Sequence, residues 1–481
     1  MTSWTSSLAR RSRLERLLWA GGPVALGSAL ALSGAPLTIT LGVIACLAFV
    51  AFVALSVREP YWFIAAFLFS LEILPPLFFP SWGTTPVYLS LLLLPVAGLI
   101  IIFRLPDIRF TRDPLANGLA AFLGGTAASL PFAFWLSGTH VGVESLFRWL
   151  LLGLMALTYF LIRWTAACAR SPVERWTFRI LLVGAALSAG FGILDFVWPL
   201  PWQHPAAEQF IWFETAILRR AQGVFFESSN FANFCGFFLT VTAAAFLDKK
   251  ERLLALPRWL LILLVPIFSL AVLVAFSRST WAAVAVALLA FGCLFGHAKH
   301  RRTLGLFVVA AVPLLLLWNY SPALWNYFLK ARMGYLTGIL VDPNFVTSGR
   351  FDTWLRVLSI LHDNPQYLIF GVGYKALPFT QLFHGEIITD NGYLNLLLET
   401  GMAGLLGFLM FSGAILRTFS RLARAHDEEL AFWSRVMFAV WCGELVQLLA
   451  VDAYTFWRNM IVMVAVMALT LNRAERLERS R

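Results

Sequence analysis

Eight arginines occur in segments of the chain where positive charge is otherwise rare. They are Arg148, Arg219, Arg220, Arg278, Arg332, Arg350, Arg356 and Arg458. An arginine at or inside a membrane boundary is costly unless it pairs with an acid, a lipid headgroup or a substrate. Because guanidinium groups present paired N–H donors that match phosphate oxygens, this set is a candidate for binding a phosphorylated ligand.

The composition predicts that these arginines belong to a membrane protein. Of the 481 residues, 59% are hydrophobic and only 13% are charged, whereas a soluble domain is about 45–50% apolar. Runs of about 20 apolar residues, long enough to cross a bilayer, recur along the chain. We therefore expect an all-α polytopic membrane protein with about 12–14 transmembrane helices, formed by residues 1–481 as a single membrane domain. The fourteen candidate spans are Leu17–Leu32, Leu37–Val57, Tyr61–Phe79, Val87–Phe103, Leu115–Leu136, Leu146–Ile162, Phe178–Trp198, Ala232–Leu247, Trp259–Phe276, Thr280–Phe295, Leu304–Trp318, Tyr393–Leu416, Leu430–Val451 and Phe456–Leu471.

The distribution of Lys and Arg between alternate loops predicts the orientation. With the N-terminus in the cytoplasm, 27 of the 37 Lys and Arg residues fall on the cytoplasmic side. This excess follows the positive-inside rule, so we expect a multi-pass protein of the bacterial inner membrane with both termini cytoplasmic. We interpret the first span as an uncleaved signal anchor, because Pro36 stands at the position where cleavage would leave it first.

Two segments then face the extracytoplasmic side, residues 199–230 and a larger loop of residues 319–392. In the larger loop, Ser348 can cap an amphipathic helix over residues 349–362, which could lie in the plane of the interface. The net charge of +11 does not indicate nucleic acid, because the basic residues form short clusters between apolar runs. The five cysteines show no metal-site or disulfide spacing, so we expect neither.

Four short motifs carry a family resemblance. They are residues 220–230 (RAQGVFFESSN), 276–279 (FSRS), 371–373 (GVG) and 390–404 (DNGYLNLLLETGMAG). In order, spacing and expected outward position, they resemble the O-antigen ligase and polymerase superfamily of integral-membrane glycosyltransferases, over roughly residues 215–415. The resemblance implies a metal-independent, inverting glycosyltransferase without a cofactor. Its partners would be an undecaprenyl-diphosphate-linked glycan and a glycan or lipid acceptor.

The resemblance also implies roles for particular residues. Arg220 and Arg278 match the arginines that would bind the diphosphate, and the position of Arg350 at the start of the amphipathic helix makes it a third candidate. Asp390 stands where the ligases have histidine, so it is the candidate base that takes the acceptor proton. An aspartate there is more typical of the polymerase and exopolysaccharide branches, which favours a polymerase over a lipid A-core ligase.

Other candidates and alternatives remain open at this level. His384 could be the base in place of Asp390, and Glu227 and Asn391 could position the acceptor. Asp390 could instead be only a helix N-cap, and the arginines could only snorkel. The alternative function is a transporter or a lipid-linked sugar flippase, for which Glu399, Glu444 or Asp195 would be intramembrane relays.

Overall fold

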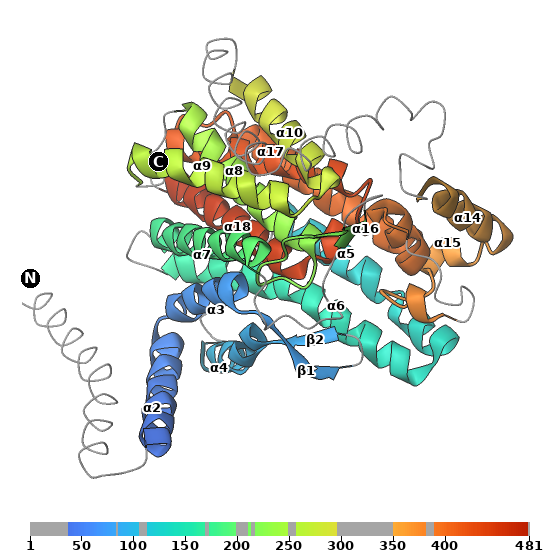
Figure 1. The fold of residues 1–481 in the computed structure, drawn as a ribbon, viewed down its shortest axis with the longest axis horizontal. Coiled ribbons are helices and arrows are strands. Elements are labelled where there is room, and N and C mark those ends of the chain that lie inside the picture. Colours follow the sequence, from blue (N-terminus) through green and yellow to red (C-terminus); the bar gives the residue numbers. More distant parts are fainter. Residues whose placement is uncertain are drawn as a thin grey trace, which may run out of the picture. The chain divides into compact units, whose positions relative to one another are not determined.

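The computed structural model describes most of the chain as helices (Figure 1). The described residues are 37–82, 85–104, 113–168, 173–198, 210–212, 217–248, 256–295, 350–380 and 389–479. The predicted spans Leu17–Leu32 and Leu304–Trp318, as well as Arg332 and His384, lie outside these residues. The chain divides into two compact units, residues 1–67 with 90–109, and residues 68–89 with 110–481.

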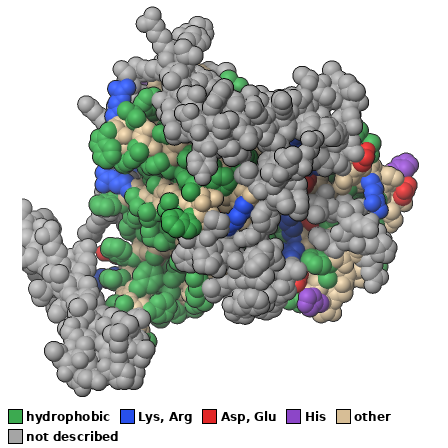
Figure 2. Space-filling model, in the orientation of Figure 1, with side chains coloured by type: hydrophobic (Ala, Val, Ile, Leu, Met, Phe, Trp, Pro, Cys, Tyr) green, Lys and Arg blue, Asp and Glu red, His purple; other side chains and the backbone are tan. Residues whose placement is uncertain are grey.

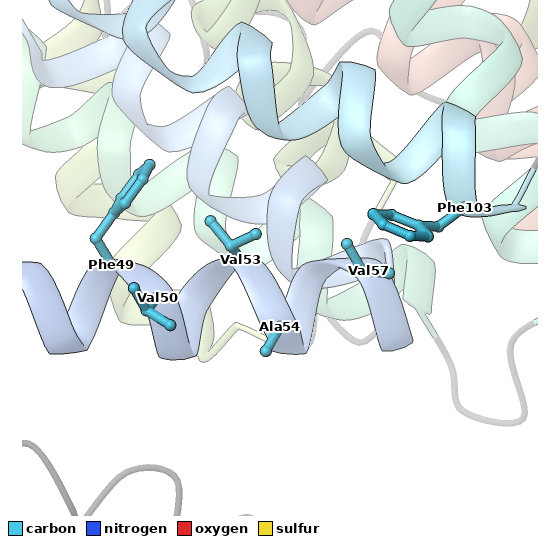
Figure 3. A pocket seen from close by; sticks show the side chains of 6 residues that line it. All are labelled: Phe49, Val50, Val53, Ala54, Val57 and Phe103. Carbon is cyan, nitrogen blue, oxygen red and sulfur yellow. The ribbon is translucent and has the colours of Figure 1, made fainter.

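The first unit is built around two apolar helices. Its elements are α2 (Leu37–Arg58), most of α3 (Tyr61–Ile73), most of the 3-10 helix η1 (Leu89–Leu93) and α4 (Leu94–Arg104). Arg104 at the end of α4 donates from Nε to the carbonyl oxygen of Val57 at 3.1 Å. A groove of about 400 Å³ between the two helices is lined only by apolar side chains, among them Phe49 and Phe103 (Figure 3). This lining suits a hydrocarbon environment, in which no polar partner is present.

The second unit holds the remaining elements. Its β-strands form two antiparallel hairpins, β1 (Pro76–Trp82) with β2 (Thr85–Tyr88), and β3 (Phe210–Trp212) with β4 (Ile217–Arg219). Its longer helices are α5 (Pro114–Ala127), α6 (Leu130–Cys168), α7 (Val173–Val197), α8 (Ser228–Asp248), α9 (Arg258–Val274), α10 (Arg278–Phe295), α14 (Arg350–Asp363), α16 (Gly392–Leu422), α17 (Glu428–Gln447) and α18 (Trp457–Arg479). Its short helices are α15 (Tyr367–Phe370) and the 3-10 turns η6 (Leu377–Phe379) and η7 (Ala453–Thr455).

The expected helical membrane architecture is confirmed. Among the described residues, four helices are long and apolar enough to cross a membrane, within α6, α7, α8 and α16. Five further apolar helices are shorter. The face of the molecule in Figure 2 accordingly carries broad areas of hydrophobic side chains and few charged ones. The count of 12–14 spans and the single membrane domain stay predictions.

Two span boundaries differ from the sequence expectation. The span expected over residues 61–79 ends at Ile73, because Pro75 and Pro76 follow and β1 begins there. The span expected over residues 115–136 is divided between α5 and α6 at Ala128 and Ser129. The sequence did not predict either hairpin, because β1 and β2 adjoin long apolar runs and β3 and β4 have only three residues each.

The helices of the second unit pack closely through small residues. Gly125 of α5 lies against the backbone of Ala403 and Gly404 of α16, so a Cβ atom there would overlap that backbone. Gly443 of α17 meets α10 in the same way at Ala283. Small residues permit close backbone approach in membranes, where burial of apolar surface does not drive helix association. Gly404 is one of the small residues at this close contact.

Candidate active site

The loop before α8 meets the turn between α9 and α10. Arg220 donates from Nε to the carbonyl oxygen of Ala275 at 2.9 Å, and the amide of Ala221 donates to Val274 at 3.0 Å. Arg278 is the first residue of α10, three residues after Ala275, and its side chain is partly exposed. Two of the motif arginines are therefore brought to one place by backbone contacts between segments far apart in the sequence.

Arg219 has a different role from its neighbour. Its guanidinium group contacts Asp195 of α7, with Nη2 3.2 Å from Oδ1 and Nη1 donating to the backbone oxygen at 2.9 Å. The side chain of Asp195 is fully buried. Arg219 therefore compensates a buried acid and ties the second hairpin to α7. Asp195, one of the candidate transport relays, is thus engaged in an ion pair with Arg219.

Arg350 and Asp390 form an ion pair. Arg350 Nε lies 2.9 Å from Asp390 Oδ2, and both side chains are about one-third exposed, at 31% and 38%. The pair joins the first residue of α14 to the segment before α16. Nearby, Trp354 Nε1 donates to the carbonyl oxygen of Thr389 at 2.8 Å, which fixes the same two segments. Two predicted site residues, one a candidate phosphate ligand and one a candidate base, are thus in direct contact.

The N-cap of α16 is Asn391, so the capping interpretation of Asp390 is wrong. Asn391 Oδ1 accepts from the amides of Tyr393 and Leu394 at 3.1 Å, and Nδ2 donates to Leu449 at 3.3 Å. Asp390 instead has a left-handed backbone with φ of +43°, which Asp adopts more readily than most residues. The acceptor-positioning role of Asn391 stays a prediction, with its side chain already committed to the cap.

The Gly371–Gly373 loop closes a break in α16. At Gly401 the backbone leaves the helix with φ 65° and ψ −166°, which frees carbonyl groups in the preceding turn. The amides of Val372 and Gly373 donate to the carbonyl oxygens of Leu398 and Glu399 at 3.0 and 2.9 Å. These amides are therefore used within the protein, and neither is available to bind a phosphate group. The break places residues 392–400 as a separate short helix beside the loop.

A polar cluster that the sequence did not indicate lies at this short helix. Lys375 forms an ion pair with Asp452, and Asn395 Nδ2 donates to Tyr454 at 3.0 Å and lies 3.3 Å from Glu399 Oε2. Burial opposes the charge on Lys375, but Asp452 and Glu399 outweigh it and raise the pKa of the ammonium group. Lys375 therefore adds a cation to the site. No local pattern identified it, because its partner is 77 residues away.

Helix α6 supports the loop that carries Lys375. Arg148 Nη1 donates to the backbone oxygen of Lys375 at 3.0 Å, and Ser145 Oγ donates to that of Tyr374 at 2.5 Å. Arg148 also lies 3.6 Å from Glu144 Oε2. It is thus a supporting residue whose guanidinium group is engaged by the protein.

Arg458 supports the loop that carries Arg220. It is 2% exposed and donates to the carbonyl oxygens of Leu71 in the last turn of α3, of Leu74 just after α3, and of Val224 at 2.9 Å. Its guanidinium carbon lies 4.5 Å from the ring centre of Phe225. Arg458 is therefore a buried structural residue, which explains one exception to the charge rule without a ligand.

Glu227 connects the two parts of the site electrostatically. It is the last residue before α8 and is partly exposed. Burial and the charges of Asp452 and Asp390 raise the pKa of Glu227 to about 7, against the opposing effect of Lys375 and Arg220. These four charged groups come from four different segments, so the arginine side and the Lys375 side of the site both act on Glu227.

A family comparison covers part of this region of the chain. Residues 260–409 match the profile of the O-antigen ligase family, which confirms the resemblance drawn from the motifs. The match includes Arg278, Arg350 and Asp390, whereas Arg220 and Glu227 precede it. No curated protein matches the chain. The protein is thus a multi-pass membrane protein with a domain of the O-antigen ligase and polymerase type, whose family acts on lipid-linked glycans.

Proposed function

We propose that this chain transfers an undecaprenyl-diphosphate-linked oligo- or polysaccharide to an acceptor hydroxyl at the periplasmic face of the inner membrane. The activity would serve O-antigen or exopolysaccharide synthesis. One observation carries the proposal, namely that two cations and two carboxylates from four separate segments act electrostatically on Glu227. A site for glycosyl transfer from a diphosphate requires both kinds of group.

The proposed chemistry is a single displacement at the anomeric carbon. The acceptor oxygen attacks this carbon, the bond to the diphosphate breaks, and the configuration inverts. Arg220, Arg278 and Arg350 would stabilise the charge that grows on the departing diphosphate. A carboxylate of the site would take the acceptor proton. This chemistry needs no metal, because a glycosyl diphosphate already carries a good leaving group.

Asp390 is the motif-based candidate for that carboxylate, and it favours a polymerase over a ligase. Its Oδ2 is held by Arg350, while Oδ1 has no hydrogen bond to another described residue. Glu227 and Asn391 would position the acceptor. His384, the alternative base, lies outside the described residues.

The transporter alternative receives less support from the contacts of the intramembrane acids. Glu444 accepts from Asn233 Nδ2 at 2.7 Å, and the same amide donates to Gln447 Oε1 at 2.9 Å. Glu399 belongs to the Lys375 cluster, and Asp195 is paired with Arg219. Each acid thus has a partner that accounts for its burial without a transported ion.

The arginines test the proposed function. Arg220→Ala and Arg278→Ala should each abolish polymer formation, and Lys at either position should restore it only in part because it lacks the bidentate fork. Polymer length is measured on gels after expression in a host that lacks the chain. Arg421→Ala, at an exposed position of α16 near its other end, is the matched control and should make normal polymer. Normal polymer in both site variants would contradict the proposed function.

A further inference from the structure

Glu227 is the carboxylate of the site whose oxygens are least engaged. Among the described residues, no side chain donates a hydrogen bond to it, and its backbone oxygen only caps the first turn of α8 by accepting from Phe231 at 3.0 Å. Asp390, by contrast, has Oδ2 fixed by Arg350 at 2.9 Å. Of the two acids, Glu227 is therefore the one free to contact a hydroxyl group with either oxygen.

The charged groups that act on Glu227 come from four segments of the chain. Arg220 lies on its own loop, Lys375 follows α15, Asp452 follows α17, and Asp390 precedes α16. Tyr88 at the end of β2 is also within electrostatic range. Arg220 places Glu227 beside the candidate diphosphate site. Lys375 and Asp452, which form an ion pair with each other, also act on its charge.

We infer that Glu227 is a further catalytic residue that removes the acceptor proton, while Asp390 orients Arg350 toward the diphosphate. This inference rests on the proposed function and changes the assignment of its base. In the step, the acceptor O–H proton moves to a Glu227 oxygen as the new bond from oxygen to the anomeric carbon forms. The electron pair of the broken bond leaves with the diphosphate. Lys375 and Asp452 are positioning residues that set the protonation of Glu227.

The protonation of Glu227 near neutrality agrees with this role. A general base is most effective when its pKa lies near the operating pH, and burial raises the pKa of Glu227 to about 7. Below that pH the carboxyl group is protonated and cannot accept, and above it the carboxylate is available. The transfer rate should therefore fall as the pH drops through about 7.

The first test measures this fall in rate at low pH, which is the acid limb of the pH–rate profile, in the full-length protein. Proteoliposomes receive undecaprenyl-diphosphate-linked repeat units extracted from cells that lack the chain, and the rate is followed from pH 5 to 9. Glu227→Gln should reduce the rate by about 10²- to 10⁴-fold and abolish the acid limb. Glu478→Gln, the same change at an exposed position near the end of α18, is the control and should leave both unchanged. Asp390→Asn should lower the rate but keep the acid limb.

The second test moves the limb without touching Glu227. Lys375→Met removes a cation that lowers the pKa of Glu227, so the limb should move to higher pH. Asp452→Asn removes an anion that raises this pKa, so the limb should move to lower pH. Shifts on the order of one unit are expected for a neighbouring charge. If Lys375 and Asp452 had only a structural role, their two variants would not move the acid limb in opposite directions. Opposite shifts would therefore support Glu227 as the base even if Glu227→Gln does not fold.

The outcomes separate this inference from the proposed function. If Arg220→Ala and Arg278→Ala are inactive but Glu227→Gln keeps the wild-type rate and acid limb, only the assignment of Glu227 is wrong. Loss of the limb in Asp390→Asn, together with its retention in Glu227→Gln, would return the base to Asp390. Full activity of both arginine variants would overturn both proposals.

Discussion

Replacing Gly401 by alanine should destabilise the protein, because this glycine forms the break in α16. Its φ of 65° and ψ of −166° lie in a region that is essentially restricted to glycine. An added Cβ would also overlap the backbone of Ile369 and Phe370 at the end of α15. Gly371 has nearly the same angles, 74° and −166°, and its Cβ would overlap the backbone of Glu399. The two glycines, one in each segment, thus allow the backbone around Gly371 to pack directly against the backbone of α16 around Gly401.

The structure sets the size of the expected effect. Backbone strain in this region costs about 1–3 kcal/mol. Moving the loop away would also break the hydrogen bonds from Val372 to Leu398 at 3.0 Å and from Gly373 to Glu399 at 2.9 Å, each worth about 1 kcal/mol. Gly401→Ala should therefore lower the free energy of unfolding by about 3–5 kcal/mol. Because the loop continues into Lys375, the variant should lose transfer activity as well.

The assay is unfolding of the purified protein in mixed micelles by titration with SDS. Gly413→Ala is a matched control in the same helix, since Gly413 is exposed and no atom lies within 4 Å of an added Cβ. That change should be neutral or stabilising by up to about 1 kcal/mol, as alanine is the better helix former. Equal midpoints for the two variants would refute the account of the break.

Two further predictions address the orientation and the support of the site. The orientation is tested in a chain without its five native cysteines, in intact cells that lack an outer barrier. A cysteine in place of Gln366 should react with an impermeant thiol reagent in these cells, whereas a cysteine in place of His426 should react only after lysis. The reverse pattern would show that the predicted orientation is wrong. Arg458→Lys should lower the free energy of unfolding by about 2–4 kcal/mol in SDS titration. One ammonium group cannot donate to the carbonyl groups of Leu71, Leu74 and Val224 at the same time. An unchanged unfolding midpoint would contradict the supporting role of Arg458.

The sequence was sufficient for the features that depend on local composition. Apolar runs and loop charges predicted the helical membrane architecture, and α14 begins at Arg350, one residue from the expected start. The motifs predicted the family, which the match over residues 260–409 confirms. Arg220 and Arg278 were singled out because their charge conflicts with the local charge pattern, a property that a sequence displays directly.

The tertiary structure decided how those residues are used. Lys375 and Asp452 stand 77 residues apart, and neither conflicts with its local pattern, so only folding reveals the pair. The sequence offered Asp390 as a helix cap, whereas the folded chain has a positive φ at Asp390, places the cap at Asn391 and pairs Asp390 with Arg350. Hydropathy and motifs are properties of neighbouring residues, but the charge state and contacts of an acid depend on all the segments packed around it.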